Sequence, residues 1–163
     1  TFVQAAALFP LRLKNMQTAS NSVELSDKAF SYLTQNIKLN NSAVNALNGD
    51  IFECHKDIAD NSLDLIVSNP PYIKTADIAS LQKEVQHEPA MALDGGESGL
   101  DFYRRIVPLW KSKLKAGGAL AFELGEGNMR GKRILADNGF GGITESIDFG
   151  GIQRAIIGTL LQK

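Results

Sequence analysis

The sequence contains a single cysteine, Cys54, and therefore cannot form an internal disulfide. This excludes a disulfide-framed secreted scaffold and favours a reducing compartment, so we expect a cytoplasmic protein. The sequence also has no marked excess of positive or negative charge. It contains 17 Lys and Arg residues and 18 Asp and Glu residues, for a net charge of −1. That balance argues against a polybasic nucleic-acid-binding protein, so a nucleic-acid partner is not expected.

Long apolar runs are absent as well. None approaches the roughly 20 residues of a membrane span, and no basic segment followed by an apolar one opens the chain. We therefore expect neither a membrane partner nor a signal peptide. The chain begins with Thr1 rather than Met, which suggests a fragment of a longer protein.

The composition is that of a globular protein, with 163 residues of which 44% are hydrophobic and 21% charged. No repeat or linker divides the chain, so we expect one domain over 1–163. Residue periodicity predicts helices over 2–9, 26–39, 78–85, 100–114 and 129–138, and strands over 19–25, 43–47, 63–68, 119–124, 143–149 and 154–160. Such alternation predicts an α/β fold, a Rossmann-like doubly wound and mostly parallel sheet with a C-terminal antiparallel hairpin.

Polar side chains follow three of the predicted strands, namely Glu24, Asp50 and Asn69. In doubly wound sheets, ligands lie in a crevice outside the carboxyl ends of the strands. One crevice can therefore hold all three side chains.

The strongest local motif is Asn69-Pro70-Pro71-Tyr72, directly after the apolar run 63–68. Two consecutive prolines remove two backbone donors and leave carbonyls that can only accept hydrogen bonds. The Asn69 side chain adds another carbonyl acceptor, and Tyr72 can stack on a planar group. Together they can hold an sp² –NH₂ group by its two hydrogens. The alternative is a simple strand-terminating turn.

This tetrapeptide resembles motif IV of the S-adenosylmethionine-dependent methyltransferases that modify exocyclic or amide nitrogens. Further segments, Glu88-Pro89, 92–100, 103–106 and 114–127, are similar to the HemK/PrmC family. We estimate that the resemblance covers most of the chain, from about Val23 to Leu160. The family methylates the glutamine side-chain amide in the Gly-Gly-Gln loop of peptide chain release factors.

The resemblance implies roles for particular residues. Asn69 and Pro70 would hold the substrate amide as the catalytic pair, and Pro71 and Tyr72 would complete the substrate pocket. S-adenosylmethionine would be bound by Asn69 together with Glu24 at the ribose, Asp50 at the adenine amino group and Ile51 as an apolar wall. From the residues alone, the favoured interpretation of Glu24 is a solvated acid at a strand end. For Asp50, an Asx-type turn and a binding role are equally good interpretations.

The chain departs from the family at its front. No G-x-G precedes Glu24, so the glycine-rich first strand-loop and the N-terminal helical domain are expected to be missing upstream. The run 123–127 imitates a glycine loop of circularly permuted methyltransferases, but the family resemblance makes it the end of the fifth strand. Cys54 and His55 lack further ligands at metal spacing, so no metal is expected.

The expected reaction is in-line attack of the amide nitrogen on the sulfonium methyl group. The acceptors of Asn69 and Pro70 would stabilise positive charge as it grows on that nitrogen. No general base is evident, and loss of the proton to water suffices. Two alternatives stay open: an N6-adenine methyltransferase acting on RNA or DNA, and a non-catalytic methyltransferase-like module that only binds a partner.

Overall fold

The computed structural model of the chain describes residues 2–4, 20–125 and 130–161. Within these residues a seven-stranded sheet has the order β3-β2-β1-β4-β5-β7-β6. Its strands are β1 (Phe2–Gln4), β2 (Ser20–Glu24), β3 (Val44–Asn48), β4 (Leu63–Ser68), β5 (Leu114–Glu123), β6 (Phe140–Ile147) and β7 (Gln153–Leu160). Strands β1 to β5 pair in parallel, and β7 is antiparallel to β5 and β6. The predicted mostly parallel sheet with a C-terminal antiparallel hairpin is confirmed.

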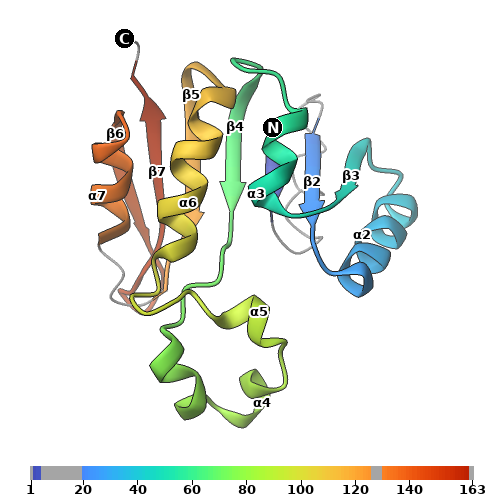
Figure 1. Ribbon diagram of the computed structural model, residues 1–163, viewed down its shortest axis with the longest axis vertical. Helices are drawn as coiled ribbons and strands as arrows, with labels where there is room; N and C mark the ends of the chain where they lie inside the picture. The colour runs from blue at the N-terminus through green and yellow to red at the C-terminus, as the bar shows by residue number, and fades with distance from the viewer. Residues whose placement is uncertain (1, 5–19, 126–129, 162–163) are drawn as a thin grey trace.

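Helices follow the strands in the expected alternation. They are α2 (Asp27–Leu39), α3 (Ile51–Cys54), α6 (Asp101–Trp110) and α7 (Arg130–Asp137), with short 3₁₀ turns η2 (His55–Asp57) and η4 (Lys111–Lys113). Helix α2 begins where Ser26 caps it, because the Ser26 hydroxyl accepts a hydrogen bond from the Ala29 N–H at 3.4 Å. Figure 1 shows α3, α6 and α7 on the side of the sheet that faces the viewer.

The core lies between this helical layer and the sheet. One face of α6 is fully buried, with Tyr103, Ile106, Val107 and Trp110 at 0–1% exposure. These residues recur at spacings of three and four, as the apolar face of a helix requires. They pack in one cluster with β4, β5 and α7, whose buried members include Ile66, Leu120, Phe122 and Leu135.

The segment between β4 and α6 leaves the sheet at its carboxyl edge. It contains the 3₁₀ turn η3 (Thr75–Ser80), α4 (Lys83–Gln86) and α5 (Ala90–Leu93). Figure 1 shows α4 and α5 below the sheet, beyond the tips of β2 and β4. The segment therefore extends the carboxyl edge of the sheet instead of covering a face of it.

Three sequence predictions are wrong in detail. Residues Phe2–Gln4 form β1 and not a helix, because they pair with a parallel strand on each side, and such ladders override local propensity. The first strand, which we expected to be missing, is therefore present between β2 and β4. The rest of the predicted helix 2–9 falls outside the described residues. The expected helix 78–85 is divided between η3 and α4, since Leu81 and Gln82 are extended. Strand β5 begins at Leu114, five residues earlier than expected.

Candidate active site

The register of the sheet brings the predicted site residues to one edge. Val3 pairs with Ser22 on one side and with Val67 on the other. Glu24 and Asn69, each two residues further along, therefore lie level at the carboxyl edge. Glu24 in turn pairs with Asn48, so Asp50 follows at the same edge. This arrangement is consistent with the single crevice that we expected from the sequence.

The N-P-P-Y segment leaves β4 with its prolines packed inward and its asparagine outward. Pro70 and Pro71 are buried, whereas Asn69 is exposed. No described residue hydrogen-bonds the Asn69 side chain, so its carbonyl oxygen can accept from a ligand.

The backbone after the prolines is clamped by the segment that follows α5. The Ile73 N–H donates to the Leu93 carbonyl at 3.0 Å, and the Gly95 N–H donates back to the Ile73 carbonyl at 2.7 Å. These two bonds form an isolated parallel bridge between Ile73 and Asp94. Segment 93–96, part of the block that carried the family resemblance, therefore fixes the position of the N-P-P-Y segment.

Asp94 organises the turn behind this clamp. Its Oδ1 accepts from the Thr75 hydroxyl at 2.7 Å and from the Gly96 N–H at 2.9 Å. These two bonds, the one from Thr75 first, lower the pKa of the Asp94 carboxyl. Asp94 thus acts in the scaffold of the site.

The aromatic end of the motif packs on the end of β5. Tyr72 is half-buried, and a Cβ added at Gly125 would lie 2.4 Å from its ring, so only glycine admits the ring there. Beside it, the buried Tyr103 hydroxyl donates to the Glu123 carbonyl oxygen at 2.7 Å. Burial raises the pKa of both phenols, and the nearby Glu123 carboxylate adds to this. Both rings therefore stay neutral at physiological pH.

A cavity of about 360 Å³ opens between the motif and the α4–α5 segment. It is lined by Asn69, Pro70, Tyr72, Ile73, Val85, Glu88, Ala92 and Leu93. The lining combines the expected amide-holding residues with apolar walls from α4 and α5. A side chain of modest size can reach Asn69 and Pro70 through this cavity.

On the opposite part of the edge, Glu24 ends β2 in a partly buried position. Its Oε1 accepts a hydrogen bond from the Ser26 N–H at 2.8 Å, and its backbone carbonyl accepts from Gly49 at 3.0 Å. A carboxylate has a second oxygen that can accept from a hydroxyl, as a ribose site requires. The geometry fits the role that the resemblance implies for Glu24.

Asp50 takes the Asx-type geometry that was one of its two interpretations. Its Oδ1 accepts from the Phe52 N–H at 2.9 Å and caps α3. Ile51 is 4% exposed, and its carbonyl accepts a 2.9 Å hydrogen bond from the Trp110 indole in the core. The local backbone that would face an adenine is thereby anchored to α6. Capping occupies one oxygen of Asp50, and the other has the chemistry to accept from an amino group.

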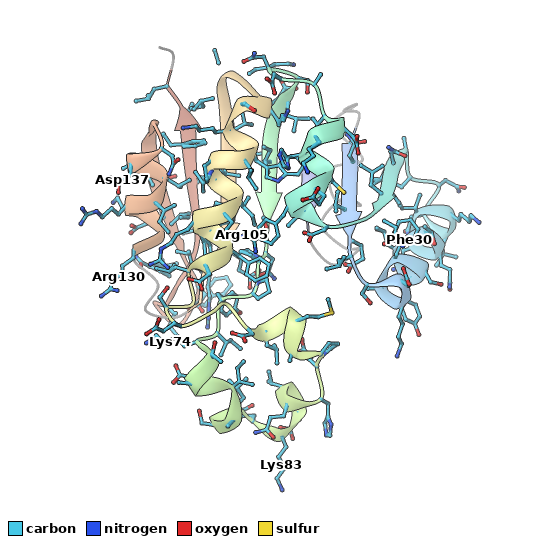
Figure 2. All side chains as sticks on the ribbon, in the orientation of Figure 1. Phe30, Lys74, Lys83, Arg105, Arg130 and Asp137 are labelled. Carbon is cyan, nitrogen blue, oxygen red and sulfur yellow. The ribbon has the colours of Figure 1, made fainter. Side chains whose placement is uncertain are left out.

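The sequence analysis missed an aromatic group beside this corner. The Phe52 and Phe102 rings lie 5.4 Å apart, and the Arg105 guanidinium lies 3.5 Å from the Phe52 ring centre. Figure 2 labels Arg105 on α6, on the side facing α3. The exposed Arg105 side chain thus makes a cation–π contact with this ring, for which sequence spacing gave no signal.

No group of three His, Cys, Asp or Glu side chains suited to a metal ion occurs in the described part of the chain. Among the same residues, no helix is both long and apolar enough to cross a membrane.

Comparison with known proteins supports the resemblance. The chain is 41% identical over 140 residues to the release factor glutamine methyltransferase of Geobacter sulfurreducens, covering 85% of this chain and 48% of that protein. It is 39% identical over 144 residues to the one of Thermodesulfovibrio yellowstonii, covering 86% and 50%. The chain therefore spans about half the length of these curated relatives. No model of a protein family matches it.

Solved structures show the same fold at low identity. A methyltransferase from Pyrococcus furiosus superposes with a TM-score of 0.73 at 18% identity, over 99% of this chain and 75% of that one. The N-terminal domain of human METTL16 in complex with SAH gives 0.66 at 18% identity, over 99% and 61%. The fold is thus the Rossmann-like methyltransferase fold. Over the half of their length that it spans, the chain is similar to release factor glutamine methyltransferases, in agreement with its resemblance to the HemK/PrmC family.

Proposed function

We propose that this chain is the catalytic domain, over 1–163, of an S-adenosylmethionine-dependent enzyme. Its proposed substrate is the side-chain amide nitrogen of the glutamine in the Gly-Gly-Gln loop of a peptide chain release factor. The observation that carries the proposal is the exposed Asn69 beside Pro70 in the lining of a cavity of about 360 Å³. A release-factor substrate also fits the expected cytoplasmic location.

The residues of the carboxyl edge fit the proposed cofactor. Glu24 ends β2 and Asp50 follows the adjacent β3, and both offer carboxylate oxygens for hydroxyl and amino donors. Ile51, expected as an apolar wall, is 4% exposed and packs in the core, so it offers little surface to an adenine. When bound, S-adenosylmethionine supplies an electrophilic methyl group on a sulfonium. The segment where a glycine-rich loop would follow β1 lies outside the described residues.

Asn69 and Pro70 perform the amide chemistry in this proposal. An amide nitrogen is a weak nucleophile because its lone pair is delocalised into the carbonyl. The Asn69 side-chain oxygen and the Pro70 carbonyl accept the two N–H groups, hold the nitrogen in line and stabilise the positive charge that grows on it. Pro71 has no N–H that would compete for these acceptors. Tyr72 forms one wall of the pocket, held in place by its contact with Gly125.

Transfer of tritiated methyl groups tests the proposal. We expect label on a release factor, none on its Gln→Ala loop variant and none on RNA. Label on RNA would favour the adenine methyltransferase alternative, whose members share the N-P-P-Y chemistry. Stable release-factor binding without any transfer would favour the non-catalytic binding module.

A calorimetric titration with S-adenosylmethionine separates failure of cofactor binding from failure of chemistry. Micromolar binding is the expected result. Absence of binding would show that this chain by itself does not form the cofactor site.

A further inference from the structure

The cavity beside Asn69 has a lining of uneven charge. Of its eight lining residues, Glu88 is the only one with a side chain that is charged at neutral pH, and no Lys, Arg or His lies among them. The other polar groups are the Asn69 amide, the Tyr72 hydroxyl and backbone carbonyls. A ligand that enters this cavity therefore meets hydrogen-bond acceptors, the neutral donors of Asn69 and Tyr72 and one negative charge, but no cation among the lining residues.

Glu88 follows α4 and is not used by the scaffold. In the described part of the chain, its carboxylate makes no hydrogen bond or ion pair; only its backbone N–H is bonded, to the Val85 carbonyl at 3.0 Å. Its charge nevertheless reaches the motif, because Glu88 contributes to the raised pKa of Tyr72, after burial and Glu123 and against Arg154. Glu88 therefore shares the electrostatic environment of the pocket without any structural partner.

We propose that Glu88 is a specificity-determining residue that makes the cavity select an uncharged carboxamide, such as glutamine, over a carboxylate, such as glutamate. The inference rests on the proposed function and adds the basis of its substrate choice. A carboxamide offers two N–H donors to the Asn69 and Pro70 oxygens, whereas a carboxylate offers none. The carboxylate would also face the Glu88 charge with no cation among the lining residues, and like charges in one site repel.

The size of the effect follows from exposure. Glu88 is exposed, so water screens its charge and the repulsion is smaller than it would be in a dry pocket. We therefore expect wild-type chain to bind a carboxamide peptide about tenfold or more tightly than the matching carboxylate peptide, from the lost hydrogen bonds and the repulsion together.

Calorimetry with two blocked peptides tests this without any methyl transfer. The probes are acetylated, C-terminally amidated peptides that contain Gly-Gly-Gln or Gly-Gly-Glu. In E88Q we expect the Gly-Gly-Glu peptide to bind about three- to tenfold more tightly than in wild type, and the Gly-Gly-Gln peptide to change less than twofold. E88D, which keeps the charge, should keep the wild-type ratio.

Glu84 provides the matched control, because it lies on α4 close to Glu88 but does not line the cavity. Its substitution by Gln removes a charge of the same sign from the same segment. E84Q should leave the ratio of the two affinities unchanged. An unchanged ratio in E88Q, or an equal change in E84Q, would overturn the assignment to Glu88. If wild-type chain methylates a release factor while E88Q keeps the wild-type ratio, this inference fails and the proposed function stands. If wild type neither binds the Gly-Gly-Gln peptide nor methylates the factor, both fail.

Discussion

The backbone of Gly95 lies directly against Tyr72 of the N-P-P-Y motif. A Cβ added at Gly95 would lie 2.7 Å from the Tyr72 Cα and 2.8 Å from the Pro71 carbonyl oxygen. Both are backbone atoms, so neither can move aside as a flexible side chain would. The close contact couples a glycine in the segment after α5 to the motif that carries the proposed chemistry.

Gly95→Ala should therefore displace the motif. We expect a loss of about 1–3 kcal/mol in the free energy of unfolding from overpacking, together with strongly reduced methyl transfer. Urea denaturation and the transfer assay measure the two effects. Gly117→Ala is the control, because its φ of +79° is strained for alanine while its added Cβ meets nothing within 4 Å. The control should lose about 1 kcal/mol of stability and keep its activity; equal activity losses in the two variants would count against the coupling.

Asn69→Ala should lower turnover much more than cofactor affinity. The side-chain oxygen is proposed to act on the developing charge of the substrate nitrogen, so we expect kcat to fall by about 10²-fold. The Kd for S-adenosylmethionine should change less, and calorimetry measures it. Asn45→Ala on β3, an exposed asparagine bonded to Asn21, should change neither. Equal losses of turnover and cofactor affinity in Asn69→Ala would contradict the amide-holding role.

Asp50 has a capping role in the structure and a proposed binding role, and substitution by serine separates them. Serine caps helices about as well as aspartate, so Asp50→Ser should keep the stability within about 0.5 kcal/mol. Loss of the carboxylate should weaken S-adenosylmethionine binding by roughly tenfold. Asp50→Ala should lose both. Unchanged cofactor affinity in Asp50→Ser would mean that Asp50 is a cap only.

Tyr103→Phe should destabilise the protein in a pH-dependent manner. The variant loses the 2.7 Å hydrogen bond to the Glu123 carbonyl, which we expect to cost about 1 kcal/mol at neutral pH. Burial raises the folded-state pKa of Tyr103, so the neutral phenol is favoured in the folded protein. This contribution is complete below the unfolded value of about 10 and is lost as the pH rises beyond it toward the folded value. The stability difference between wild type and variant, measured in urea from pH 7 to 11, should therefore shrink above pH 10; a constant difference would exclude the linkage.

Much of the fold was predictable because the strongest segments combine pattern and composition. The β-branched run 63–68 matches β4, and the apolar spacing from Tyr103 to Trp110 matches the buried face of α6. Both patterns arise because apolar residues are buried along the whole length of the segment, so each segment contains enough of them to show its period. Strand β1 was not predictable from its three residues, since parallel pairing with β2 and β4 defines it. The four-residue helices α3 and α5 are too short to show a period.

The site divides in a similar way. The sequence by itself determined which acceptors are present, since the prolines after Asn69 remove donors wherever the chain goes, and strand order then implied a common edge with Glu24 and Asp50. Only the tertiary structure decided how these groups are held. The clamp of Ile73 by Leu93 and Gly95, the contact of Tyr72 with Gly125 and the position of Glu88 in the cavity join residues far apart in the chain. Such contacts depend on how the α4–α5 segment returns to the sheet, and no local pattern encodes that path.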